Sequence, residues 1–338
     1  MDEMKKILKK ELKATEFWVF IIILALASII QVRSGQFFTN NNLVDIARSL
    51  IVPCIYAIIC LLSFISTGGP DVSFPLNAAL STYIAIRIVN ATGFNGPWWV
   101  VYLIGMFFGG IVGAINGFII VRYKFPPLIV TLGTSSLCSG ILLGAFAATR
   151  LELPDTLARF GNIMILSVKN PQNGLGATLP ATFLIMVVIY VIAYLVLNRT
   201  MIGRGIYAIG GDEVAAERAG FNVNAIRFGI FVVNGMLAAI GGLTFSVNSM
   251  RYMPNEYAGA EMNVIAAIVL GGTRLTGGVG SLRGCILGTF LLTMVTNSLI
   301  LVGISVYWQK VFIGAIIIIG TAIPVIQNYI SFRKKGEA

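Results

Sequence analysis

Residues 198–224 read NRTMIGRGIYAIGGDEVAAERAGFNVN, a polar interval between two apolar runs of membrane-spanning length. Within it, the stretch from Asp212 to Gly220 predicts a short helix, because the Asp212 carboxylate can accept from the free backbone amides at a helix start. Glu213 places negative charge near the positive end of the helix dipole, and Gly220 permits a left-handed stop. Gly210 and Gly211 are expected to release the chain from the segment before this helix.

This predicted helix is rich in small side chains. Ala215, Ala216 and Ala219 are expected to form a thin ridge that fits a groove on another protein. The alternative is an ordinary solvated loop. If the helix does bind a partner, the residues expected to dock are Asp212, Glu213, Ala215, Ala216, Glu217 and Gly220.

Composition places the whole chain in a membrane. Of its 338 residues, 57% are hydrophobic and 11% are charged, whereas soluble domains carry about 25% charged residues. Repeated apolar runs of spanning length predict an all-α polytopic membrane protein. A net charge of +10 could suggest nucleic acid, but the basic residues cluster at span ends, where they set orientation. We therefore expect membrane lipid around the chain and no nucleic-acid partner.

Ten apolar segments are present, and the third and eighth are short and broken by glycine and proline. They lie near 17–32, 43–66, 72–89, 98–121, 127–147, 178–197, 226–249, 262–272, 284–302 and 306–328. Ten spans with both termini in the cytoplasm place most of the basic residues on the inner side. The predicted organisation is a lead-in at 1–16, a transmembrane domain at 17–330 and a cytoplasmic tail at 331–338. Residues 148–177 then form an outer loop and residues 198–224 an inner one.

The fourth segment carries glycines at a spacing of four residues. Gly105, Gly109, Gly113 and Gly117 form a flat stripe that lets another helix approach closely. Static packing is the favoured interpretation, and a moving contact is the alternative.

Two interruptions occupy corresponding places in the two halves of the chain. Both begin with Gly-Gly, contain a charge and a hydroxyl, and precede a new apolar run. Such paired breaks indicate related halves, with short broken helices, around a translocation route; two tight turns are the alternative. Asp71 and Arg274 would each cost about 2.5–3.5 kcal/mol at a bilayer centre, so a boundary or a wet cavity is expected there. The residues singled out are Gly68, Gly69, Asp71, Ser73, Gly271, Gly272, Thr273, Gly277 and Gly278.

Several amides and hydroxyls fall inside the apolar segments, where they need polar partners. The candidates for lining a translocation path are Asn77, Ser81, Asn116, Thr131, Thr134, Asn234 and Asn248. Helix-to-helix hydrogen bonding is the alternative role.

Enzyme chemistry finds little support in the sequence. The chain has no histidine, which excludes a zinc HExxH site and a Ser-His pair. Its four cysteines show no metal or disulfide spacing. No catalytic residue, metal or cofactor is expected.

Four blocks, in order along residues 40–325, resemble the ribose-type sugar permeases of bacterial ABC importers. GGPDVS at 68–73 resembles the family's GGIDLS motif, and NGFIIVRYKFPPLIVTLGT at 116–134 is similar to its NG…PPFIVTLGT stretch. GRGIYAIGGDEVAAERAG at 203–220 and AAIVLGGTRLTGGVGS at 266–281 resemble two further signatures. The chain departs from the pattern at Pro70 and at Phe74-Pro75, where the family has Val-Gly.

The resemblance implies a permease of the bacterial cytoplasmic membrane that imports a monosaccharide or similar polyol. It implies ATP-binding subunits on the cytoplasmic side, an extracytoplasmic sugar-binding protein and a second permease, identical or paralogous. Residues 198–224 would carry the coupling helix. The alternatives are a permease for nucleosides or branched-chain amino acids, an ion-coupled secondary transporter, and a structural membrane subunit. Proton relays need acidic residues inside spans, and Asp45, Asp71 and Glu261 lie near segment ends.

Overall fold

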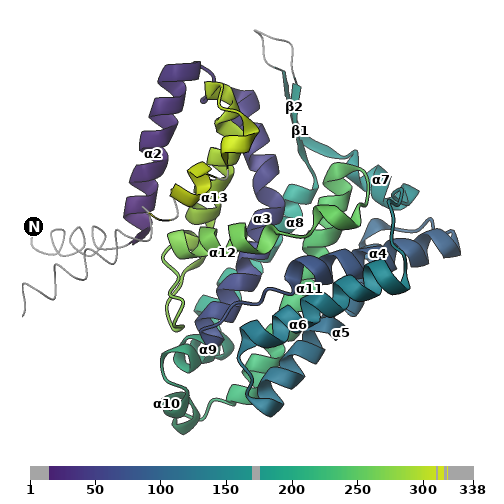
Figure 1. Ribbon diagram of the computed structural model, residues 1–338, viewed down its shortest axis with the longest axis vertical. Coiled ribbons are helices and arrows are strands. Elements are labelled where there is room, and N and C mark those ends of the chain that lie inside the picture. Colours follow the sequence, from purple (N-terminus) through teal and green to yellow (C-terminus); the bar gives the residue numbers. More distant parts are fainter. Residues whose placement is uncertain (1–14, 170–175, 310, 316–317, 319–338) are drawn as a thin grey trace, which may run out of the picture.

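The computed structural model describes residues 15–169, 176–309, 311–315 and 318, and this part of the chain is mostly helical (Figure 1). The longer helices are α2 (Thr15–Ser34), α3 (Asn40–Thr67), α4 (Phe74–Thr92), α5 (Trp98–Tyr123), α6 (Pro127–Gly140), α8 (Thr182–Arg199), α11 (Val223–Ser249) and α13 (Leu282–Ser298). The shorter helices are α7 (Asp155–Gly161), α9 (Met201–Gly211), α10 (Glu213–Arg218) and α12 (Ala260–Leu270). Single turns are η1 (Ile141–Ala145), η2 (Pro254–Glu256), η3 (Ile300–Val302) and η4 (Val306–Trp308).

The prediction of an all-α polytopic membrane protein is confirmed. Seven helical segments in the described part are long and apolar enough to cross a membrane. The third and eighth expected segments are α4 and the short α12, which fall outside those seven. Most of the expected last span, most of the 1–16 lead-in and all of the 331–338 tail lie outside the described residues.

Helices α3 and α11 form the centre of the molecule. Both are largely buried, whereas α2, α5, α6 and α8 expose many large apolar side chains. On α5, Phe107, Ile111, Ile115 and Phe118 are exposed on the side away from its glycines. Apolar exposure of this kind is expected where helices face lipid rather than water.

The glycine stripe of α5 packs closely against α11, as both interpretations of its spacing require. A Cβ atom on Gly109 would lie 2.3 Å from the Gly235 carbonyl oxygen, and one on Gly113 would lie 2.2 Å from that of Phe231. Gly235 makes the matching contact on α11, where an added Cβ atom would lie 2.1 Å from the Gly109 carbonyl oxygen. Only backbones without side chains can approach so closely.

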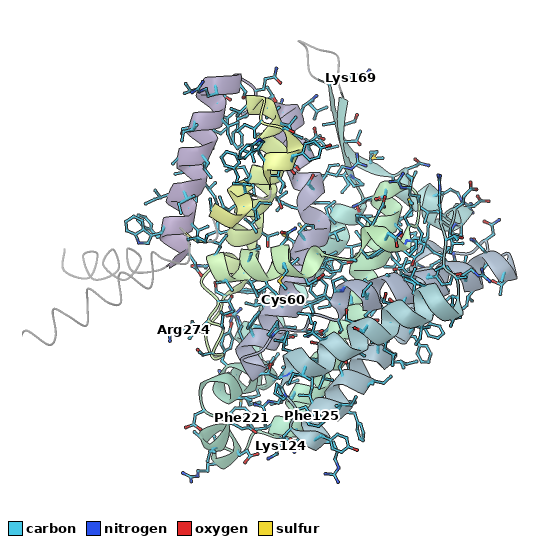
Figure 2. All side chains as sticks on the ribbon, viewed as in Figure 1. Cys60, Lys124, Phe125, Lys169, Phe221 and Arg274 are labelled. Carbon is cyan, nitrogen blue, oxygen red and sulfur yellow. The ribbon has the colours of Figure 1, made fainter. Side chains whose placement is uncertain are left out.

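Two paired strands that the sequence did not predict begin within the expected 148–177 loop and extend to Pro180. Strands β1 (Met164–Lys169) and β2 (Gly176–Pro180) pair antiparallel. Leu151 and Tyr252 also exchange backbone hydrogen bonds of 3.1 and 3.0 Å, which join this segment to the chain after α11. The hairpin and α10 lie at opposite ends of the molecule (Figure 1). Lys169 likewise lies far from Lys124 and Arg274 (Figure 2).

Candidate functional site

Helix α10 has the ends that the sequence predicts. Asp212 Oδ1 accepts a hydrogen bond of 3.0 Å from the Ala215 amide at the N-cap. Gly220 has a φ of 89°, the left-handed conformation expected beyond the helix end. Glu213 also pairs with Arg227 of α11 at 2.8 Å, which fixes α10 against the start of that helix.

The orientation of α10 corrects one prediction. Ala216 is only 2% exposed and packs with Ile209 and Val223, so it does not belong to an exposed ridge. Ala215 and Ala219 are exposed, as expected for that ridge. The remaining docking candidates Asp212, Glu217 and Gly220 are exposed too, and Glu213 is partly exposed.

Sequence analysis missed Val214 on the same short helix. Its side chain is 55% exposed, although the helices around it are fixed by caps and an ion pair. Exposed aliphatic side chains on a polar segment mark protein contacts when they gather in patches. An isolated valine among acidic residues gave no such signal in the sequence. With Ala215 and Ala219 it forms what we call the α10 face.

Helix α9 ends at Gly211, and Asp212 is its extended C-cap, so the two glycines lie at the end of the segment before α10 as expected. Gly210 also permits close contact. A Cβ atom there would lie 1.6 Å from the Ile65 carbonyl oxygen of α3 and 2.5 Å from the Gly278 amide nitrogen. Tyr207, one turn earlier, donates its hydroxyl to the Gly280 carbonyl at 3.0 Å.

The two Gly-Gly interruptions meet at this same point. The Gly278 amide donates to the Ile65 carbonyl at 3.0 Å, just before Gly68. Gly68 has a φ of 65°, and a Cβ there would lie 3.0 Å from the Thr276 carbonyl oxygen. We call this contact of α9, the end of α3 and the 271–280 loop the glycine junction. The structure thus places the paired interruptions side by side, next to the end of α9 that leads into α10.

The other residues of the two motifs surround the glycine junction. Gly69 contacts Pro127, Gly271 contacts Gly284, and Gly277 contacts Gly210. Gly272 has a φ of 91° and Thr273 is buried. Arg274 is exposed and points away from the helices (Figure 2).

Asp71 lies between α3 and α4 and is only 3% exposed. Its Oδ1 accepts from the Ser73 amide at 2.9 Å and the Ser73 hydroxyl at 2.7 Å. Among the described residues Asp71 has no ion-pair partner within 4.0 Å. The carboxylate is therefore held by neutral donors, which a buried charge requires when no countercharge is present.

Amides from two other helices extend this arrangement. Asn116 of α5 donates to the Ser73 hydroxyl at 2.9 Å and accepts from Thr134 of α6. Asn234 of α11 donates to Ser63 of α3 at 2.8 Å and to Asp71 Oδ2 at 3.5 Å. Five helices or connections are thereby tied together in a buried polar network.

The remaining path candidates fall into two groups. Thr131 accepts from the Val72 amide at 3.2 Å, Asn77 donates to the Gly109 carbonyl at 3.2 Å, and Ser81 donates to the Asn77 carbonyl at 2.6 Å. All three are buried. Asn248 instead lines a cavity of about 480 Å³ between α3, α11, α12 and α13. Its Oδ1 accepts from Thr182 at 2.7 Å.

Replacing Asn116 or Asn234 with leucine is expected to impair uptake by the assembled protein while leaving recruitment of its partners intact. Each change keeps the branching of the side chain, adds bulk, and removes the hydrogen bonds that the amide makes, to Ser73 and Thr134 or to Ser63 and Asp71. A buried unsatisfied group costs about 1–3 kcal/mol. Thermal unfolding in detergent and substrate uptake would measure the effect. Asn90→Leu, at an exposed position on α4, is the control; wild-type uptake in both buried variants would reduce these amides to dispensable contacts between helices.

Comparison with known proteins identifies a family and several relatives of this chain. The family model described as branched-chain amino acid transport system / permease component matches residues 42–321. The ribose import permease protein RbsC of Haemophilus influenzae is 30% identical over 320 residues, 93% of this chain and 94% of that protein. The autoinducer 2 import system permease protein LsrC of Photorhabdus luminescens is 32% identical over 305 residues, 90% of this chain and 87% of that protein. No solved structure matches the chain.

Proposed function

The chain belongs to the family of branched-chain amino acid transport system permease components, and we propose that it is the membrane subunit of an ATP-driven importer of a monosaccharide or similar polyol. As a multi-pass permease, it is a transporter component rather than an enzyme. The ribose and autoinducer 2 permeases that it resembles over nine-tenths of its length favour a sugar over an amino acid or nucleoside.

ATP hydrolysis belongs to separate ATP-binding subunits that dock on the α10 face. The observation that carries this proposal is that α10 is fixed to α11 by the Glu213–Arg227 pair and adjoins the glycine junction. A movement imposed on α10 would reach α9, and through Gly210 it would reach both interruptions. The proposed docking residues are Val214, Ala215 and Ala219 of the α10 face together with Asp212, Glu213, Glu217 and Gly220. Ala216 supports them from beneath.

Orientation follows from this docking. The end that holds α10 faces the cytoplasm, both termini lie on that side, and the hairpin end faces outward in a bacterial cytoplasmic membrane. There an extracytoplasmic binding protein delivers the sugar, and a second permease subunit, identical or paralogous, completes the assembly. Basic residues such as Arg199, Arg204, Arg218 and Lys124 at the α10 end support this orientation.

The seven path candidates have different positions along the proposed route. Asn248 faces the cavity already, whereas the other six are buried in the conformation described. We propose that these six come into contact with substrate only when the helices around the polar network separate. Gly68, Gly69, Asp71, Ser73, Gly271, Gly272, Thr273, Gly277 and Gly278 form the broken segments at which that separation takes place.

The proposed function is tested by reconstituting the chain with its ATP-binding subunits and binding protein in proteoliposomes. Uptake of radiolabelled D-ribose, measured with ATP on the α10 side, is expected to exceed uptake without ATP by at least about tenfold, since primary transport requires hydrolysis. Labelled leucine should accumulate no faster than without ATP. Leucine uptake without ribose uptake would overturn the sugar assignment, and uptake of ribose without ATP would overturn the ATP-driven mechanism.

A further inference from the structure

The cavity between α3, α11, α12 and α13 has walls of mixed chemistry. Thr289, Thr293 and Thr296 occupy successive turns on one face of α13, and Asn248 and Asn263 contribute amides from α11 and α12. Tyr56, Phe245 and Tyr257 add aromatic rings. The cavity lies toward the end of α11 that is distant from α10, because α11 begins next to α10 at Val223 and ends at Ser249.

The two charged side chains that line this cavity, Arg48 and Glu256, already bind other groups of the protein. Arg48 donates to the Asn248 carbonyl at 3.1 Å, and Glu256 pairs with Arg251 at 2.6 Å. One positive and one negative side chain line the space, so it has no net charge to select an ionic ligand. Hydroxyl and amide groups can both donate and accept, which suits a neutral ligand that bears several hydroxyls.

Tyr56 is the most informative residue of the lining. It is only 4% exposed, and its hydroxyl has no hydrogen-bond partner among the described residues. A buried hydroxyl left unpaired destabilises the folded state. Its ring is held in place by Phe74, at a centroid distance of 4.9 Å, and by Gly241, where a Cβ would lie 2.3 Å from the ring.

Tyr56 also separates the cavity from the polar network. Ser63 lies two helical turns further along α3, about 10 Å away, and bonds there to Asn234. On α11, Gly241 and Asn234 are likewise two helical turns apart. Gly241 contacts the Tyr56 ring, and Asn234 belongs to the polar network. The two helices therefore place the ring between the cavity and the network that holds Asp71.

We propose that this cavity is a transit site for a neutral polyhydroxylated ligand of monosaccharide size, and that the Tyr56 hydroxyl, which is closed off from the cavity in this conformation, bonds the ligand at the inner end once the helices around it separate. The inference rests on the proposed function and identifies where the sugar is held before it reaches the buried network. A volume of about 480 Å³ falls within the range of small-molecule sites. The aromatic rings supply apolar surface for the C–H faces of a sugar.

The test uses the complete reconstituted transporter with two cavity variants, Tyr56→Phe and Thr293→Val, which keep shape and remove one hydroxyl each. D-ribose uptake at saturating binding protein is expected to fall about fivefold to tenfold in each, the effect of losing one hydrogen bond. ATP hydrolysis stimulated by the binding protein should stay at its wild-type rate, because the α10 face is unaltered. Thermal stability of Tyr56→Phe should be equal or higher, since an unpaired hydroxyl is removed.

The matched controls are Tyr102→Phe and Thr244→Val, whose hydroxyls bond to each other at 3.3 Å away from the cavity lining. They are expected to lower stability while leaving ribose uptake near wild type. Wild-type uptake in both cavity variants, from a transporter that imports ribose, would overturn the transit site alone. Absence of ribose uptake by the wild-type transporter would count first against the proposed function, and with it against the ligand class of this cavity.

Discussion

Gly210→Ala is expected to abolish ATP-driven uptake while the chain still inserts in the membrane. The added Cβ would lie 1.6 Å from the Ile65 carbonyl oxygen and 2.5 Å from the Gly278 nitrogen. Both neighbours are backbone atoms, so no side-chain rotation can relieve the overlap. Helix α9 must move away, which breaks the 3.0 Å bond from Gly278 to Ile65 or the 3.0 Å bond from Tyr207 to Gly280.

Gly211→Ala is the matched control for this variant. Gly211 is the neighbouring residue of the same helix, and a Cβ there would meet nothing within 4 Å. Overpacking typically costs about 1–3 kcal/mol, so Gly210→Ala should unfold at lower temperature than Gly211→Ala. Ribose uptake in proteoliposomes and ATP hydrolysis are measured together. Loss of uptake with retained hydrolysis would show that movement of α10 no longer reaches the two interruptions through the glycine junction. Equal uptake in the two variants would contradict this role of the glycine junction.

Val214→Asp is expected to release the permease from its ATP-binding subunits. Val214 is the large apolar side chain of the α10 face, and a charge there must be desolvated when a partner covers it. Central contacts of an interface cost about 2 kcal/mol or more when lost, roughly a thirtyfold loss of affinity. The folded permease itself should be unaffected, because the side chain is 55% exposed and touches little of its own chain.

Co-purification of tagged ATP-binding subunits with the permease measures this loss. Val32→Asp is the control, since Val32 is 86% exposed, two residues before α2 ends at Ser34, and α2 lies apart from α10 (Figure 1). Val32→Asp should co-purify like the wild type. Full recovery of the ATP-binding subunits with Val214→Asp would show that α10 does not belong to the interface.

Local features of the coupling segment could be predicted because their causes lie within a few residues. The Asp212 cap and the Gly220 stop involve chain neighbours, and both occur as expected. The face of α10 could not be predicted, because six residues contain too little periodicity to say which alanine is buried. For that reason a bulky substitution at Ala216, next to Ile209 and Val223, would disturb folding of the segment as well as docking.

Contacts between distant residues explain the other differences. Asn116, Thr134 and Asn234 are recognisable as polar residues in apolar segments, but their shared link to Asp71 and Ser73 joins parts of the chain as far as 163 residues apart. Gly210 and Gly211 end α9 as their sequence suggested, but the close approach of Gly210 to Ile65 and Gly278 could not be predicted from neighbouring residues. The glycine stripe of α5 was predictable as a packing face, since its spacing alone defines it.

The central claim is that the α10 face receives the ATP-binding subunits on the cytoplasmic side. Val214→Cys, in a chain whose Cys54, Cys60, Cys138 and Cys285 are all free and buried, can be labelled with a membrane-impermeant maleimide. We expect labelling in inside-out vesicles, none in right-side-out cells, and a labelling rate at least about tenfold lower once ATP-binding subunits are added, because a covered side chain leaves the solvent. Labelling at an unchanged rate with those subunits bound, or labelling from outside the cell, would contradict the account.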